Sequence, residues 1–110
     1  MIYHLALVSD LEAARAGGSY RVSSLGRTLD DEGFIHASYP GQVAGVGERY
    51  YRDVREPLVL LVIDEARLGA PVRVEGGFPH VYGPITLDAV VEERPVSRDP
   101  DGTLRVTGLE

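Results

Sequence analysis

Six consecutive apolar residues at positions 58–63 constrain the fold more than any other segment of the sequence. A strand that is apolar at every position is typically buried on both faces, so this segment is predicted to be a central strand of a β-sheet. The chain has 110 residues, which is enough to build one hydrophobic core around such a strand. We therefore expect a single domain over residues 1–110.

Shorter strands are predicted on both sides of this segment. Residues 2–8 are apolar nearly throughout, which favours a second, mostly buried strand. A hairpin turn is expected at Gly76-Gly77, a tight turn at residues 99–102, and a rigid stretch at residues 80–83 between two prolines. Further strands are predicted at residues 20–22, 34–37, 72–75, 89–92 and 104–106.

The first of two predicted main helices follows residue 8. Ser9 and Glu12 have the spacing of a capping box, and Gly17-Gly18 can end the helix because glycine adopts the left-handed conformation easily. Between this helix and the strand at 34–37, residues 23–33 are expected to form a polar loop. In that loop, Asp30, Asp31 and Glu32 are interpreted as a solvated face.

The second main helix is predicted from residue 40 or 41 to about residue 51, with Ser38 as its cap. Its apolar residues Val43, Val46 and Tyr50 would share one face, because they are spaced i, i+3 and i+7. Together the elements predict an α+β fold, in which a mixed, mostly antiparallel sheet carries two main helices.

Charge and composition limit the classes of function. The net charge is −6 and all 11 basic residues are arginine, so nucleic acid is not an expected partner and no lysine is available for Schiff-base chemistry. The absence of cysteine excludes disulfides and thiolate nucleophiles. No apolar run is long enough to span a membrane and no basic signal segment precedes the first strand, so a cytoplasmic location is expected.

The three histidines are the most informative residues for function, because His4, His36 and His80 all have apolar neighbours. Each could be a core histidine that donates to a backbone carbonyl, but three such histidines together favour one shared polar cleft. Glu75 is the carboxylate expected near them, since it is close to His80 in sequence. None of the compact metal-binding motifs is present, so no metal site is predicted.

Two segments that contain histidine carry a resemblance to a known family. Residues 33–38, followed by Gln42, and residues 78–85 resemble domain-of-unknown-function family 952, an uncharacterised bacterial family. The resemblance extends over residues 2–96, nearly the whole chain, and by itself implies no reaction.

A more distant resemblance implies chemistry. His4 on the first strand is similar to the strand-one histidine of the ADP-ribosyltransferase fold, and residues 34–38 are similar to the histidine strand of RNA 2′-phosphotransferases, which share that fold and use NAD. The resemblance implies an ADP-ribosyltransferase-like fold in which His4 and His36 line a cleft for NAD or another nucleotide. In such a cleft, Glu75 would stabilise an oxocarbenium-like ribose, Tyr82 would stack on a base, Arg21 or Arg27 would bind phosphate, and Ser38 would contact the cofactor.

Three hypotheses about function follow. In the leading one, the chain is a small ADP-ribosyltransferase-like domain that binds NAD, a nucleotide or a sugar phosphate, either as a transferase or as a binding protein only. In the second, His36 and His80 are the acid and base, with Glu75, of an enzyme acting on another small metabolite. In the third, the chain is a non-catalytic module, which could be a homodimer, for a ligand or a protein partner. All three hypotheses require the imidazoles of His4, His36 and His80 to lie around one solvent-accessible pocket.

Overall fold

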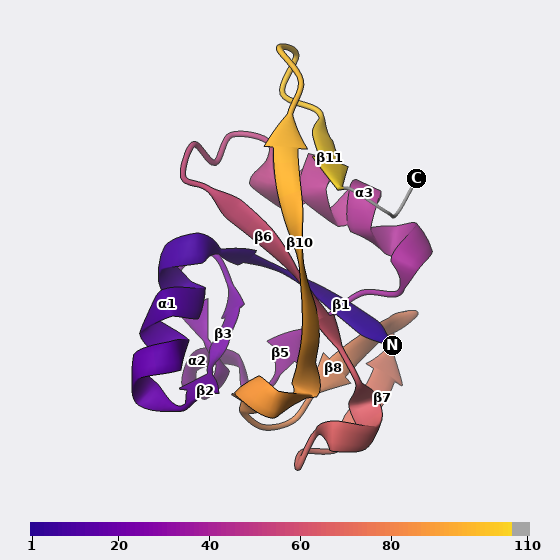
Figure 1. Ribbon diagram of the computed structural model, residues 1–110. Helices are drawn as coiled ribbons and strands as arrows, with labels where there is room; N and C mark the ends of the chain where they lie inside the picture. The colour runs from indigo at the N-terminus through magenta and orange to yellow at the C-terminus, as the bar shows by residue number, and fades with distance from the viewer. Residues whose placement is uncertain (107–110) are drawn as a thin grey trace.

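A four-stranded antiparallel sheet, with strand order β1-β6-β10-β11, runs through the computed structural model, which describes residues 1–106 (Figure 1). Its strands are β1 (Ile2–Leu7), β6 (Leu58–Ile63), β10 (Val90–Arg98) and β11 (Leu104–Val106). Strand β6 pairs with β1 on one side and β10 on the other, and each of its six residues is buried. The prediction that residues 58–63 form a central strand is confirmed.

Each face of this sheet is covered by a different helical segment. Leu61 and Ile63 pack in a core with Leu11 of helix α1 (Val8–Gly17). Leu60 packs in a second core with Tyr51, which belongs to the helical segment at residues 40–51. The burial of β6 on both faces therefore follows from alternate side chains entering two different cores.

Helix α1 ends as predicted but begins differently. Gly18 has a φ of 94° and its N–H bonds the carbonyl of Ala14, which closes the helix. The predicted capping box of Ser9 and Glu12 is wrong, because the helix already begins at Val8 and its N-cap, Leu7, makes no side-chain bond. The chain passes directly from β1 into the helix, so Ser9 lies within the first turn.

The segment at residues 40–51 is less regular than the predicted second helix. It consists of a 3₁₀ turn η1 (Pro40–Gln42), helix α3 (Val43–Val46) and a π turn η2 (Gly47–Tyr51). A π turn takes in one more residue than an α turn, so Tyr51 enters the core and Tyr50 is 59% exposed. Tyr50 therefore does not join Val43 and Val46 in this core, although the three residues were predicted to share one face. Ser38 is not the cap, because its backbone pairs with Tyr3 before the helical segment begins.

The predicted polar loop at residues 23–33 is also wrong, because this segment has regular structure. It contains part of β3 (Val22–Ser24), which pairs with β4 (Arg27–Thr28), and then the short helix α2 (Leu29–Glu32). A capping box between Thr28 and Asp31 starts α2, and Gly33 with a φ of 82° ends it. A separate two-stranded sheet is formed by β2 (Ser19–Tyr20) and β9 (Ile85–Thr86).

A small antiparallel sheet with strand order β5-β8-β7 carries two of the histidines. Its strands are β5 (Ile35–His36), β8 (Phe78–Val81) and β7 (Val72–Glu75). The predicted hairpin turn is confirmed, with φ values of 61° at Gly76 and 85° at Gly77. His80, which was expected in a rigid turn, instead lies within β8. Two single turns, η3 (Glu65–Arg67) and η4 (Leu87–Ala89), complete the described fold.

These elements confirm the α+β class. All described strand pairs are antiparallel, and they form four separate sheets rather than the one mixed sheet that was predicted. None of the helices within residues 1–106 has the length and apolar character needed to cross a membrane.

Gly83, just after β8, gives a first test of the packing. A Cβ atom at this position would lie 2.6 Å from the Cβ of Ala70, which is fixed to the backbone and cannot rotate away. Gly83→Ala is expected to lower the free energy of unfolding by about 1–3 kcal/mol through overpacking, measured by urea denaturation. Gly17→Ala is the control, since nothing lies within 4 Å of its added Cβ. Equal stability of both variants would contradict this packing.

Candidate functional site

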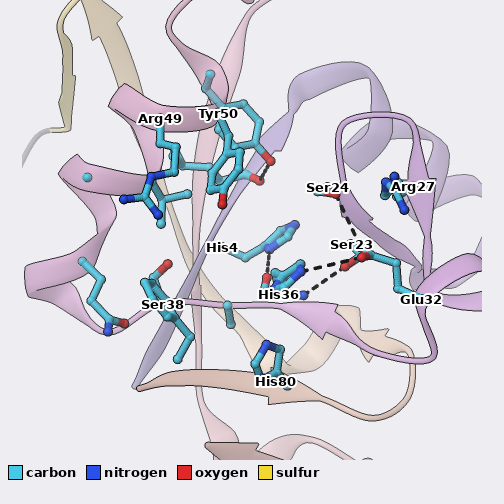
Figure 2. A pocket seen from close by; sticks show the side chains of 17 residues that line it. His4, Ser23, Ser24, Arg27, Glu32, His36, Ser38, Arg49, Tyr50 and His80 are labelled. Atoms are coloured by element: carbon cyan, nitrogen blue, oxygen red, sulfur yellow. Dashed lines mark hydrogen bonds and ion pairs between the residues drawn. The ribbon is translucent and has the colours of Figure 1, made fainter. Parts of the chain in front are cut away.

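A pocket of about 480 Å³ lies between the β5-β8 strands, the β3-β4 hairpin and the helical segment at residues 43–51 (Figure 2). All three histidines of the chain are among the residues that line it. The lining also includes the polar side chains of Ser23, Ser24, Arg27, Glu32, Ser38, Gln42, Arg49 and Tyr50. The volume lies within the range of about 300–1,000 Å³ that is typical of small-molecule sites.

Strand register brings His36 and His80 together. The two residues are direct partners in the antiparallel β5-β8 pair, so their side chains lie on the same face of the sheet. Their ring centroids are 5.0 Å apart, with an angle of 59° between the ring planes. Phe34 contacts both rings edge-on, with centroid distances of 4.9 Å to His36 and 4.5 Å to His80.

His4 lies at the base of the pocket and has protein partners at both ring nitrogens. Its Nδ1 bonds the backbone carbonyl of His36, and its Nε2 lies 3.1 Å from the Tyr20 hydroxyl. A carbonyl can only accept, so Nδ1 carries the proton and Nε2 accepts from Tyr20. Burial lowers the pKa of His4 to about 4, the main cause being desolvation of its charged form. His4 thus has the geometry of a core histidine, and it holds the strand that carries His36.

Glu32 is a site residue that the sequence analysis missed. It was interpreted as part of a solvated face, but its side chain is only 16% exposed and its Oε2 lies 3.8 Å from His36 Nε2. The Ser24 hydroxyl donates to its other oxygen at 3.5 Å. One signal was available, the Thr28–Asp31 capping box, which places Glu32 on a helix.

The pKa of the half-exposed His36 ring lies below its ordinary value. Desolvation lowers its pKa most, the charge of Glu32 partly opposes this effect, and the neighbouring His80 lowers the pKa further. A neutral imidazole offers one donor and one acceptor, so His36 can exchange a proton with a bound molecule.

Glu75 lies beside His80 but is not among the residues that line the pocket. Its Oε1 is 4.0 Å from Nδ1 of His80 and accepts a hydrogen bond from the Tyr82 hydroxyl. The Tyr82 ring is in turn covered by Arg73, whose guanidinium carbon is 5.5 Å from the ring centroid. Glu75 therefore lies beside His80 outside the pocket lining, bonded to Tyr82, with Arg73 over the Tyr82 ring.

Of the two arginines considered for phosphate binding, Arg27 lines the pocket and Arg21 does not. The guanidinium of Arg21 bonds Asp30 at 3.1 Å. Arg49, which sequence reasoning missed, also lines the pocket, because the π turn carries it and Tyr50 to the pocket wall. Ser38 is buried and lines the pocket as well.

The charge of the pocket differs in sign from that of the chain. Two arginines and one glutamate line it, whereas the chain as a whole has a net charge of −6. Within residues 1–106, no group of three or more histidine and carboxylate side chains is placed to hold a metal ion. The arrangement suits a small anion contacted by arginines and imidazoles.

Comparison with known protein families identifies the chain. The family described as protein of unknown function (DUF952) matches residues 6–93. The chain belongs to the DUF952 family. Among curated proteins, none matches this DUF952 member.

Solved structures of a Caulobacter crescentus protein, CC0527, are similar to this DUF952 member. The crystal structure of CC0527 has 30% sequence identity and a TM-score of 0.81, and the match covers 94% of this chain and 92% of that one. The solution NMR structure has 30% identity and a TM-score of 0.73, with 98% of this chain and 91% of that one covered. The fold described above is therefore shared with CC0527.

Proposed function

We propose that the pocket binds a nucleotide or a related sugar phosphate, with NAD as the candidate cofactor. The observation that carries this proposal is the pair of arginines, Arg27 and Arg49, beside the imidazoles of a pocket of about 480 Å³. In a chain with a net charge of −6, most of the surface repels anions, so a pocket with two guanidinium groups attracts them selectively.

The remaining lining supports a ligand that has a ribose and a planar base. Tyr50 is 59% exposed at the pocket and lies next to Arg49, whose guanidinium carbon is 6.0 Å from the tyrosine ring centroid. An exposed aromatic ring can stack on a base, which is worth roughly 1–3 kcal/mol. Ser38 would bond a ribose hydroxyl group. Tyr50 thereby takes the stacking role that the resemblance implied for Tyr82.

The proposal includes the likeness to the ADP-ribosyltransferase fold, which supplies NAD as a ligand to test. It assigns His4 a positioning role, since both of its ring nitrogens already have protein partners. It moves phosphate binding from Arg21 to Arg27 and Arg49, because these two line the pocket.

Titration calorimetry with AMP, NAD, ribose 5-phosphate and adenosine tests the proposal. We expect the three phosphorylated ligands to bind and adenosine to bind much more weakly. Arg27→Gln and Arg49→Gln should each weaken AMP binding by roughly tenfold or more, because a hydrogen bond to a charged group contributes about 1.5–3 kcal/mol. Arg21→Gln is the matched control and should bind AMP like the wild type.

Two results would contradict the proposal. One is the absence of binding by every phosphorylated ligand at millimolar concentration. The other is AMP binding that is weakened as much by Arg21→Gln as by the two pocket variants.

A further inference from the structure

We propose that His36 and His80 transfer protons in the hydrolysis of a phosphate ester bound in this pocket, a step that rests on the proposed function. Two imidazoles with ring centroids 5.0 Å apart lie side by side on one face of the β5-β8 pair. Each has a carboxylate beside it, Glu32 at 3.8 Å from His36 and Glu75 at 4.0 Å from His80. Figure 2 shows the two labelled imidazoles close to each other within the pocket.

His80 has the surroundings of a ring that is held for proton transfer. Its side chain is only 10% exposed, and its buried Nδ1 has no hydrogen-bond partner within residues 1–106. The nearest carboxylate oxygen is Glu75 Oε1, which already accepts from the Tyr82 hydroxyl. Buried polar atoms are nearly always bonded, so an unbonded ring nitrogen 4.0 Å from a carboxylate points to Glu75 as the group that orients His80. Glu75 and Tyr82 are therefore positioning residues for His80.

His36 is suited to act as the base. Its ring is more exposed than that of His80, with 46% of the side chain accessible, so a water molecule can reach it. Burial and the neighbouring His80 lower its pKa, so its ring is free to accept a proton near neutral pH. His80 is then the acid.

The charges favour reaction at phosphorus over cleavage of a glycosidic bond. Glycoside cleavage generally uses two carboxyl groups that flank the bond, and Glu32 is the one carboxylate among the described residues lining this pocket. A phosphate ester carries its negative charge on the oxygens around phosphorus, where Arg27 and Arg49 can neutralise it.

The step balances with water as the second reactant. A water oxygen forms a bond to phosphorus while His36 takes its proton. The bond from phosphorus to the ester oxygen breaks, and that oxygen keeps the electron pair and takes a proton from His80. The products are a phosphate with one more hydroxyl group and a free alcohol, and proton exchange with solvent restores both rings.

Release of phenol tests the step, with thymidine 5′-monophosphate phenyl ester and phenyl phosphate as substrates, because phenol, unlike 4-nitrophenol, needs a proton as it leaves near neutral pH. The wild type is expected to release phenol from at least one of them. His36→Gln and His80→Gln should each lower kcat by about 10²–10⁴-fold, the usual contribution of one proton-transfer group. Both variants should still bind AMP, as measured by calorimetry.

The positioning residues need a readout that a purely structural role would not change. Glu75→Gln and Tyr82→Phe should lower kcat with KM unchanged, and should shift the limb of the pH–rate profile that reports on His80. Glu92→Gln is the matched control, because Glu92 lies on a strand outside the pocket and is 50% exposed, close to the 54% of Glu75. Glu75→Gln and Tyr82→Phe also test the role of His80 if the His80→Gln variant does not fold.

The outcomes separate this inference from the proposed function. AMP binding by the wild type without turnover of either ester overturns the inference alone. Neither binding nor turnover overturns both. Turnover that persists at the wild-type rate in His36→Gln, or in both Glu75→Gln and Tyr82→Phe, also overturns the inference.

Discussion

Leu61→Ala is expected to lower the free energy of unfolding by about 2–5 kcal/mol, which is the usual range for a fully buried leucine. Leu61 has 0% exposure and lies in the middle of β6, where it faces His4 in β1 and Glu93 in β10. Strand β6 is hydrogen-bonded to β1 on one side and to β10 on the other. The backbone around Leu61 therefore cannot move in to fill the cavity that the missing side chain leaves. Because single domains are typically stable by only about 5–15 kcal/mol, this loss would bring the protein close to unfolding.

Urea denaturation followed by circular dichroism measures this effect. Leu25→Ala is the control, because Leu25 is 39% exposed and should contribute little. A loss of similar size in the two variants would contradict the assignment of β6 as the buried centre of the sheet.

Acidification from pH 7 to pH 5 is expected to lower the free energy of unfolding by about 2 kcal/mol through His4 alone. The pKa of His4 is about 4 in the folded chain and 6.5 as its ordinary value. Between these two values the unfolded chain binds a proton that the folded chain does not. Stability from this residue is therefore fully present above pH 6.5 and decreases as the pH falls toward 4.

His4→Gln isolates this contribution. A glutamine amide can donate to the His36 carbonyl and accept from Tyr20, but it does not titrate. Unfolding curves of the variant should therefore depend less on pH between 7 and 5 than those of the wild type. His36 titrates in both proteins, so its contribution cancels in the comparison. An identical pH dependence would show that His4 is not the buried neutral histidine described here.

Local sequence patterns were reliable where a segment had one dominant signal. The apolar run at 58–63 and the Gly76-Gly77 turn appear in the structure as predicted. The failures are at places where two signals compete. Ser9 has a good capping pattern, but the chain enters the helix directly from β1, so the cap is not used. Tyr50 has helical spacing for the core, but the π turn puts Tyr51 there instead.

The candidate site could be predicted only in part. His4, His36 and His80 were singled out from their apolar neighbours, and all three line the pocket. Glu32 and Arg49 were missed, since an acidic residue beside two others and an arginine on an irregular turn look like ordinary surface residues.

The sequence by itself determined the α+β class, the central strand and the three histidines as candidates, because each depends on residue type and local spacing. Only the tertiary structure decided which side chains meet. The β5-β8 register places His36 opposite His80, and the hydrogen bond of His4 to the His36 carbonyl joins β1 to this pair. Pairing between strands that are 44 positions apart in sequence depends on how the whole chain packs, and no local pattern specifies it.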